Sequence, residues 1–350
     1  MPAYLNSAQV ALPVALYLAT DNYDHVPGVL SATQIMKATR QQILTARVPA
    51  EQRSIDVMGL VKSRMGSSIH DGVERAWSNP TLRMLGLQSL GLDESIANRI
   101  VFNPEETLRG HGYEERSLKD LVMTEGPIAK DAIAVYMEIR GFRQIAGRWV
   151  SGKFDFVGES MPHDFKSTGT FTWTKGVKWE DYQIQLSIYK WLNPEIIQGD
   201  VGFIHFFFTD WKQWETQNPA YPTHPIMTKE IPLWSLQETE DYLNFKLNQF
   251  DLYKDSTEDL IPLCNDKELW RRDDVWKVYK DPANTKRAIN GGGGFKDEGA
   301  AHVFNQEKTG GAGAVVKFPG QVNACKYCDA FSICSQKDSL IADGSLQFNN

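Results

Sequence analysis

The sequence contains few cysteines and no excess of positive charge. Four cysteines in 350 residues are too few for the disulfide framework of a small secreted domain. The 37 Lys and Arg against 44 Asp and Glu give a net charge of −7, which excludes a protein that coats nucleic acid by bulk positive charge. A local basic cleft is compatible with this balance. The composition, 42% hydrophobic and 23% charged, is that of an ordinary globular protein.

Long apolar runs and nucleotide-binding loops are also missing. The apolar run Val201 to Phe208 is too short to span a bilayer and is better explained as a buried strand. A second run, Val10 to Ala19, has no Lys or Arg before it and contains Pro13, which argues against a secretory signal. We therefore expect a cytoplasmic protein with no membrane partner. The sequence has no G-x-x-x-x-G-K-[ST] loop, which excludes a built-in helicase motor, and no hydrolase elbow or dinucleotide fingerprint.

The length of the chain predicts about two domains. Residues 56–77 have the apolar spacing of a helix, whereas the residues from Arg148 onward alternate with the period of a strand. We expect an α/β fold in which a central mixed β-sheet is flanked by helices. The expected organisation is an N-terminal segment (1–55), a core (56–255), a region that carries the cysteines (256–336) and a tail (337–350).

Three helices of the expected core can be placed from their patterns. Trp179 to Leu192 has apolar residues spaced to face a core. Ser235-x-x-Glu238 has the form of a capping box ahead of an amphipathic helix that extends to about Tyr253. Ser117 to Met123 has the pattern of a helix start.

A hairpin is expected after Arg148. Phe154 and Phe156 are predicted to share one face of its first strand, because alternate residues of a strand point to the same side. Residues 158–162 are typical of a turn, and residues 163–167 of the return strand.

This hairpin would bring two acids and a lysine together. Asp164 and Lys166 are two residues apart and therefore point to the same side of the return strand, which Asp155 can also face. Carboxylate oxygens suit Mg²⁺ or Mn²⁺, and a nearby lysine activates a metal-bound water or stabilises charge on a phosphate. The alternative is a surface hairpin with an ordinary ion pair, because D-x-K recurs by chance in many sequences.

Two polar pairs on predicted helices accompany these residues. Gln185 and Tyr189 lie four positions apart on one helical face and can position the lysine or a phosphate, although such a pair is often only a polar helix edge. His70 and Glu74 share a face in the pattern G-x-x-x-H-x-x-x-E. Imidazole is a good ligand for divalent metals, whereas a lone helical histidine is more often structural.

Two further features have both a nucleic-acid interpretation and a simpler one. The segment Ser31 to Arg53 carries four basic residues, including Arg40, and could line a DNA path, but a solvated helix face is the simpler interpretation. Four tryptophans could stack on the bases of a single strand, although such residues are more often core or rim residues. They are Trp173, Trp179, Trp211 and Trp214.

The order G-x-x-x-H-x-x-x-E, G-x-x-D, D-x-K and Q-x-x-x-Y, over roughly residues 60–210, resembles the PD-(D/E)XK nuclease superfamily in its RecB-type branch. The resemblance implies a restriction-endonuclease-like core. Carried over by position, it implies that Asp155 and Asp164 are the metal-binding acidic pair and that Lys166 is the catalytic lysine. Many members have Glu where this chain has Asp164, and the family pattern allows either.

The same resemblance implies roles for the other matching residues. His70 would be a further metal ligand, and Phe165 would lend its backbone carbonyl to the metal. Gln185 and Tyr189 match the motif that packs beside the active site. The implied catalytic cofactor is Mg²⁺ or Mn²⁺.

All four cysteines lie in the last quarter of the chain, three of them as Cys325-x-x-Cys328-x-x-x-x-x-Cys334. Two thiolates at C-x-x-C spacing reach one metal centre, and a fourth completes a zinc site or an iron–sulfur cluster. The spacing resembles iron–sulfur nucleases of the RecB-type branch, including AddB-type and CRISPR-associated adaptation nucleases. This resemblance favours a 4Fe–4S cluster over Zn²⁺, and inert thiols are a third alternative. The relatives usually take their first cysteine from before the nuclease motifs, so Cys264 as fourth ligand departs from their pattern.

The resulting hypothesis is a metal-dependent exonuclease that hydrolyses phosphodiester bonds of single-stranded or end-bearing DNA in recombination or repair. The motor-free architecture resembles phage-encoded or CRISPR-type members, which act in a bacterial cytoplasm. Recombination or repair proteins and a second copy of the chain are further partner hypotheses. Two alternatives stay open: a non-catalytic nucleic-acid-binding module with a structural metal cluster, and a nuclease that acts on RNA.

Overall fold

The computed structural model describes residues 3–20, 26–49, 54–119, 121, 123–126, 129–290 and 293–348. The chain divides into two units. The first contains Met1–Met36 and Ser54–Asn248, and the second contains Lys37–Arg53 and Gln249–Asn350. The expected N-terminal segment 1–55 thus contributes residues to both units.

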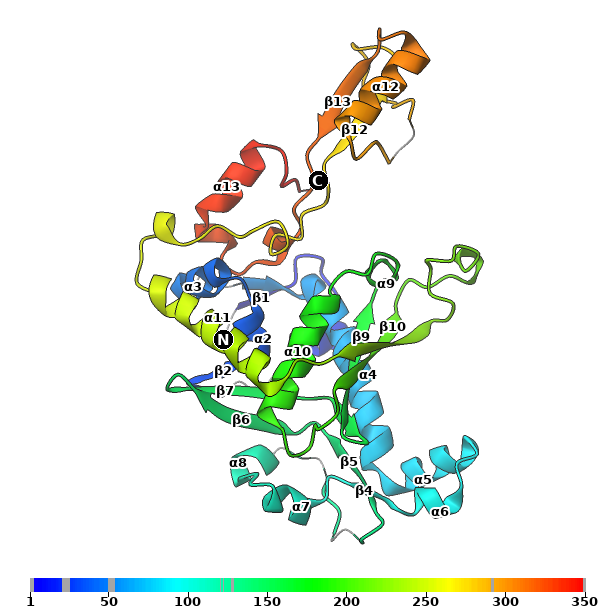
Figure 1. The fold of residues 1–350 in the computed structure, drawn as a ribbon, viewed down its shortest axis with the longest axis vertical. Helices are drawn as coiled ribbons and strands as arrows, with labels where there is room; N and C mark the ends of the chain where they lie inside the picture. The colour runs from blue at the N-terminus through cyan, green and yellow to red at the C-terminus, as the bar shows by residue number, and fades with distance from the viewer. Residues whose placement is uncertain are drawn as a thin grey trace. The chain divides into compact units, whose positions relative to one another are not determined.

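The first unit is built on a six-stranded mixed sheet, and the fold is α/β with flanking helices, as the sequence predicts (Figure 1). The strands are β4 (Ile100–Phe102), β5 (Ile133–Met137), β8 (Phe156–Gly158), β9 (Met161–Thr168), β10 (Val201–Phe208) and β11 (Ile226–Pro232). Their order is β11-β10-β9-β8-β5-β4. The pairs β9/β10 and β4/β5 are parallel, and the other neighbours are antiparallel.

Two smaller sheets complete the strands of this unit. The three-stranded sheet has the order β2-β7-β6 and consists of β2 (Val29–Ser31), β6 (Arg140–Ile145) and β7 (Arg148–Lys153). β1 (Ala3–Leu5) pairs in parallel with β3 (Ser54–Asp56).

The longest helices of the first unit are α4 and α10. Within the part of the chain that the structure describes, no helix is both long and apolar enough to cross a membrane. The helices before the large sheet are α1 (Leu12–Ala19), α2 (Ala32–Met36), η2 (Val57–Leu60), α4 (Val61–Ser78), α5 (Pro80–Ser89) and α6 (Glu94–Ala97). The later ones are α7 (Glu105–Gly110), α8 (Glu115–Leu118), α9 (Phe171–Thr174), α10 (Trp179–Leu192) and η3 (Gln213–Glu215), with α11 (Leu236–Tyr253) running on into the second unit.

The main core forms where α10 crosses from β9 to the parallel strand β10. A helix is the usual connection between parallel strands because their ends lie at opposite edges of the sheet. α10 is buried along much of its length, and Leu186, Ile188 and Trp191 are fully buried. The alternation of buried and half-buried residues along β10 places Ile204 and Phe206 in this same core.

Two of the predicted elements are confirmed to the residue. α10 begins at Trp179 and ends at Leu192, and β10 spans the predicted strand. The capping box before α11 is also present. Ser235 Oγ accepts a hydrogen bond from Glu238 N at 3.2 Å, and Glu238 Oε2 accepts one from Ser235 N at 2.8 Å.

The prediction that Phe154 and Phe156 share one strand face is wrong. β7 ends at Lys153 and β8 begins at Phe156, because the chain passes here from the three-stranded sheet to the six-stranded one. Phe154 packs in the main core, whereas Phe156 packs in a separate cluster with Trp77. The intervening Asp155 therefore lies at a junction between two sheets.

Two boundaries also differ from the prediction. The turn before β9 is shorter than expected, because Glu159 and Ser160 alone adopt positive φ, at 50° and 62°, and β9 already starts at Met161. Such a two-residue turn matches the twist of paired strands. The helix expected from Ser117 is a single turn that ends at Leu118, and residues 120 and 122 of that prediction lie outside the described residues.

The second unit has two apolar clusters and a small hairpin. β12 (Val275–Tyr279) pairs antiparallel with β13 (Ala314–Phe318), and α12 (Glu298–Thr309) packs on both (Figure 1). Ile43 and Ile261 belong to one cluster, and Leu269 and Leu340 to the other. The remaining helices are α3 (Thr39–Arg47), η4 (Glu258–Leu260), η5 (Ala324–Tyr327), η6 (Phe331–Ile333) and α13 (Ser335–Ala342).

Candidate functional site

A cleft of about 680 Å³ in the first unit is lined by α4 and by the strands β6, β7 and β9. Its lining includes residues singled out in the sequence, namely His70, Glu74, Asp155, Phe165, Lys166 and Tyr189. α4 and α10 both pack on β9 (Figure 1). Successive side chains of a strand point to opposite faces, so alternate residues of β9 meet different helices.

Asp164 and Lys166 lie on the side of β9 that contacts α10. Lys166 Nζ is 2.6 Å from Asp164 Oδ2, so the expected same-side geometry is present. Asp164 is only 1% exposed, and its Oδ1 accepts a hydrogen bond from Gln185 Nε2 at 3.3 Å. The same amide nitrogen donates to Tyr189 Oη at 2.8 Å. The helical spacing of Gln185 and Tyr189 thus places both beside the buried acid.

The glycine of the G-x-x-D motif sets how closely β7 approaches α10. A Cβ atom at Gly152 would lie 2.8 Å from Leu192 Cδ1 and 3.0 Å from Tyr189 Cε1. Cores are close-packed, so a side chain here would push the helix away. Gly152 therefore allows the Tyr189 ring to lie against the strand that leads to Asp155.

Asp155 lies at the junction of the two sheets and contacts residues of both β9 and α4. Its Oδ2 accepts a hydrogen bond from Phe165 N at 2.8 Å and lies 3.5 Å from His70 Nδ1. The other ring nitrogen of His70, Nε2, donates to the Phe165 carbonyl oxygen at 2.9 Å. Metal-binding histidines commonly donate their second N–H to a carbonyl in this way, which fixes the tautomer. Nδ1 is then the ring nitrogen that faces Asp155.

Glu138 is a member of the site that the sequence did not indicate. Within the described residues, only His70, Glu138 and Asp155 form a group whose metal-binding atoms all lie within 4.8 Å of one another. Glu138 follows β5 with a positive φ of 57° and forms an ion pair with Lys153 at 2.6 Å. A single Glu after a strand is part of no recognisable sequence motif, so the sequence alone did not point to it. Asp164 is not a member of this close group, because its oxygens contact Lys166 and Gln185.

Burial and like charge raise the pKa of acids in the cleft. Burial, followed by the charge of Asp164, raises the pKa of Asp155 to about 7. Burial and the charge of Glu138 also raise the pKa of Glu74. Burial lowers the pKa of Lys166, but Asp164 and Asp155 raise it by more, so the net direction is upward. The cleft thus contains crowded negative charge, which a bound cation would relieve.

The donor set of this cleft fits Mg²⁺ or Mn²⁺. The site has carboxylates from Asp155 and Glu138 and an imidazole nitrogen from His70, with the acids destabilised by their mutual proximity. Hard divalent cations take carboxylate oxygens and complete their coordination with water. The Phe165 carbonyl, expected from the resemblance as a ligand, is here the acceptor for His70 Nε2.

A pair of histidines, His163 and His205, lies on the same side of the sheet as Phe165. His163 Nδ1 is 2.9 Å from His205 Nε2 on the neighbouring strand, and their rings stack. Burial, followed by the charge of His205, lowers the pKa of His163 to about 4. The pair is therefore neutral at pH 7, and its hydrogen bond ties β9 to β10.

The four cysteines lie in one region of the second unit, although among the described residues no three of their Sγ atoms come within 4.8 Å of one another. Burial, followed by the charge of Glu268, raises the pKa of Cys264 to about 12, and the other three cysteines contribute less to this shift. Cys325 lies in η5, Cys328 follows it directly, and Cys334 precedes α13. Cys264 and Cys325 pack in one apolar cluster of the unit, whereas Cys328 and Cys334 pack in the other. Four thiols gathered among apolar residues are a donor set that fits an iron–sulfur cluster or Zn²⁺.

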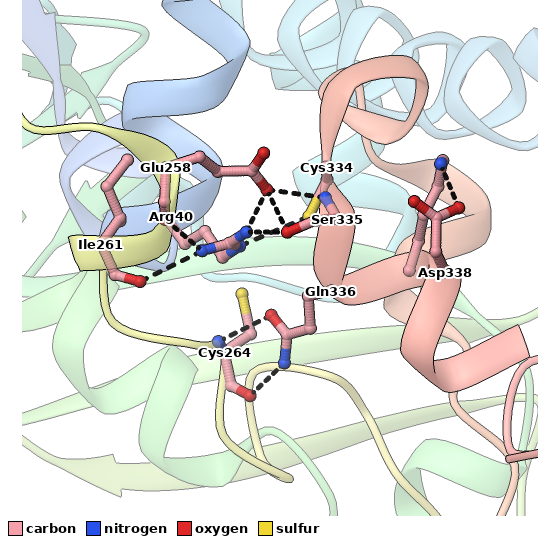
Figure 2. A network of polar contacts seen from close by, with 9 residues as sticks. Arg40, Glu258, Ile261, Cys264, Cys334, Ser335, Gln336 and Asp338 are labelled. Carbon is pink, nitrogen blue, oxygen red and sulfur yellow. Dashed lines mark hydrogen bonds and ion pairs between the residues drawn. The ribbon is translucent and has the colours of Figure 1, made fainter. Parts of the chain in front are cut away.

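Cys264 is held to α13 through its backbone. Its N–H donates to Gln336 Oε1 at 2.9 Å, and its carbonyl accepts from Gln336 Nε2 at 2.9 Å (Figure 2). Gln336 is two residues after Cys334. A single amide side chain therefore fixes the distant Cys264 beside the C-terminal cysteines, which supports Cys264 as the fourth member of the group.

Two expectations about exposed residues are corrected or refined. Arg40 lines no solvated helix face, because it is 2% exposed and pairs with Glu258 within the second unit. The reason is the folding of α3 onto a segment more than 200 residues away. Trp173, Trp179 and Trp211 pack partly buried against the main core, whereas Trp214 is 73% exposed.

Comparisons with known proteins give weak structural matches only. No protein-family model and no curated protein matches the chain. A solved structure described as SSO0001 is similar over 65% of this chain and 78% of its own, with 12% identity and a TM-score of 0.34. A phage-related exonuclease from Haemophilus somnus 129PT is similar over 65% of this chain and 95% of its own, with 14% identity and a TM-score of 0.24.

Proposed function

We propose that this protein is a divalent-metal-dependent deoxyribonuclease, an exonuclease that hydrolyses phosphodiester bonds at DNA ends in recombination or repair. The observation that carries the proposal is the convergence of His70, Glu138 and Asp155 in one cleft, with the Asp164–Lys166 ion pair on the adjacent strand. A metal-binding acid group beside a lysine that a buried acid holds is the arrangement that phosphodiester hydrolysis needs. An ordinary surface ion pair would not be 1% exposed at its acid.

The residues divide into those that would hold the cation and those that position them. His70, Glu138 and Asp155 would bind Mg²⁺ or Mn²⁺, with Asp164 on the adjacent strand. When bound, the cation would make a water molecule more acidic and neutralise charge on the phosphate. Gln185 holds Asp164 through its Oδ1, and the Phe165 N–H holds Asp155 through its Oδ2.

Lys166 would act on the phosphate and its attacking water. The Nζ atom lines the cleft and is held by Asp164. An ammonium group there stabilises the charge that develops as a water oxygen bonds to phosphorus and a P–O ester bond breaks. The proton from the water passes to solvent or to the leaving oxygen, so the hydrolysis needs no co-reactant.

The chemistry of the cysteine donor set supports a second element of the proposal. The four cysteines would bind a 4Fe–4S cluster, with Zn²⁺ as the alternative, and would stabilise the second unit. Loop closure from Cys264 to Cys325 spans about 60 residues, for which a cross-link removes substantial entropy from the unfolded chain. The colour and the iron content of protein purified without oxygen test this element, because a zinc protein is colourless.

End-labelled DNA tests the activity. Single-stranded, double-stranded and circular DNA, and RNA of the same sequence, are incubated with Mg²⁺ or Mn²⁺ and the wild type, Asp164→Ala or Lys166→Ala. We expect wild-type cleavage of linear DNA only, and loss of about 10²-fold or more in each variant. Glu94→Gln and Arg99→Gln, which change exposed charges outside the cleft, are matched controls.

Each alternative predicts a different result in the same assay. Binding of DNA without cleavage would favour a non-catalytic binding module. Preferential cleavage of RNA would show that RNA, not DNA, is the substrate. Cleavage of circular DNA would show endonuclease action. Full activity of both variants would show that Asp164 and Lys166 are not needed for catalysis.

A further inference from the structure

We propose that Arg40 is a positioning residue of the cysteine-bound metal centre, and that its guanidinium, by donating to Cys334 Sγ, sets the reduction potential and the retention of that centre. The proposal rests on the cysteine site proposed above. It assigns a function to a residue that the nuclease motifs leave unexplained and that belongs to the same unit as all four cysteines.

The guanidinium of Arg40 uses all of its donors inside the second unit. Nε donates to Cys334 Sγ at 3.4 Å. Nη1 donates to the carbonyl oxygens of Glu258 and Ile261, at 3.2 and 3.1 Å. Nη2 donates to Glu258 Oε1 and to Ser335 Oγ, the latter at 3.2 Å (Figure 2). Arg has five N–H donors, so the sulfur contact accounts for the last of them.

Glu258 extends this network to the backbone beside Cys334. Its Oε1 accepts from Ser335 N at 2.6 Å and from Ser335 Oγ at 2.8 Å, in addition to Arg40 Nη2. Arg40 and Glu258 thus hold the residue next to Cys334 from two sides (Figure 2). The cysteine can change its position only if this network, which is buried at Arg40, breaks.

The helix that carries Arg40 also closes the apolar side of the site. Ile43 and Leu44 of α3 are both 2% exposed and belong to the cluster that contains Cys328 and Cys334. A buried cation among such residues costs free energy unless a negative partner compensates it. Glu258 is one partner, and a thiolate at Cys334 would be a second.

This geometry determines the direction of the electrochemical effect. Hydrogen bonds to the ligating sulfurs, and positive charge near a cluster, favour its reduced and more negative state. Replacing Arg40 by Gln should therefore lower the midpoint potential. Replacing Glu258 by Gln removes a negative charge while the cation stays, so the potential should rise. A merely structural network would instead affect both variants in the same direction.

The test uses the full chain, purified without oxygen, as wild type, Arg40→Gln, Glu258→Gln and Arg47→Gln. Arg47 is the matched control, because it lies on the same helix and donates to the carbonyls of Lys254 and Ser256 rather than to sulfur. Redox titration followed by absorbance gives the midpoint potential, and transfer to a chelator gives the rate of metal loss. We expect opposite potential shifts for the first two variants and about tenfold faster metal loss for Arg40→Gln.

The outcomes separate this proposal from the one on which it depends. Wild-type protein without bound metal would overturn the centre itself, whatever Arg40 does. A wild-type potential and metal-loss rate in Arg40→Gln, or a shift shared with Glu258→Gln, would overturn the role of Arg40 alone. If the metal is Zn²⁺, which is not redox-active, the rate of metal loss alone tests the role of Arg40. If Arg40→Gln does not fold, Arg40→Lys keeps the charge without the fork of donors, and an unchanged rate of loss in that variant would overturn the proposal.

Discussion

Asp155 Oδ2 accepts a hydrogen bond from the backbone N–H of Phe165 at 2.8 Å, and this contact fixes the junction of the two sheets against β9. Asp155 lies in the two residues between β7 and β8, where the chain changes sheets. Phe165 holds two residues that line the cleft, because its N–H donates to Asp155 and its carbonyl accepts from His70 Nε2. The position of the acid is therefore set by backbone geometry rather than by a flexible side-chain pair.

Glu138→Gln should weaken the binding of Mn²⁺ while preserving the fold. The change removes one carboxylate from the group formed with His70 and Asp155, but keeps the size of the side chain. We expect metal affinity to fall by at least about 10- to 100-fold, because the loss of even an outer-shell partner of a metal ligand has an effect of this size. Calorimetric titration with Mn²⁺ measures the affinity, and circular dichroism checks the fold. An affinity for Mn²⁺ equal to that of the wild type would show that Glu138 does not bind the metal.

Gln185→Ala and Tyr189→Phe should separate two contributions to the position of Asp164. Loss of the Gln185 amide leaves Asp164 Oδ1, a buried oxygen, without its hydrogen bond. We expect a cost of about 1–3 kcal/mol in the free energy of unfolding, together with reduced nuclease activity. Tyr189→Phe removes only the acceptor of the second amide hydrogen bond, so its cost should be about 1 kcal/mol. Urea denaturation compares the two, and a larger effect for Tyr189→Phe would contradict this order.

The residues of the candidate site that the sequence places together are those linked by short-range spacing. Asp164 and Lys166 are two apart on a strand, and Gln185 and Tyr189 are four apart on a helix, so a regular element alone places each pair. The order of the D-x-K and Q-x-x-x-Y motifs along the chain then indicated that the strand and the helix belong to one site. Their hydrogen bond across β9 and α10 needed only that both elements form as predicted.

The parts that were missed depend on contacts between distant segments. Glu138 reaches the cleft because the chain leaves one sheet after β5 and enters another at β6, and no local pattern reports this change. The same change of sheets separated Phe154 from Phe156. Arg40 looked like part of a solvated basic helix, since its burial depends on Glu258, which is 218 residues away. Long-range pairing of this kind leaves no period in the sequence.

Metal binding in the cleft should strengthen as the pH rises through about 7, the pKa that burial and Asp164 give to Asp155. A proton competes with the cation for this carboxylate, so affinity should fall about tenfold per pH unit below that value and level off above it. The metal-free protein should respond in the opposite direction. Its folded state binds more protons than the unfolded chain between about pH 4 and pH 7, so its free energy of unfolding falls across that interval as the pH rises.

Two measurements check these opposite slopes. Mn²⁺ titrations at pH 5.5, 6.5 and 7.5 report the affinity, and urea denaturation of the metal-free protein over the same range reports the stability. Asp155→Asn should flatten both dependences, because an amide neither titrates nor binds the cation well. Unchanged slopes in Asp155→Asn would assign the titration to another group.

Gln336→Met should loosen the cysteine site without changing any cysteine. The substitution keeps the length and volume of the side chain but removes both hydrogen bonds to the backbone of Cys264. Leaving that N–H and carbonyl without partners should cost about 2–3 kcal/mol in the free energy of unfolding. Cys264 would then move relative to Cys334, so the bound metal should be lost to a chelator several-fold faster than from the wild type. Gln347→Met, which alters an exposed glutamine near the C-terminus of the second unit, is the matched control. Equal rates of metal loss for the two variants would show that Cys264 does not depend on Gln336 and would argue against it as the fourth ligand.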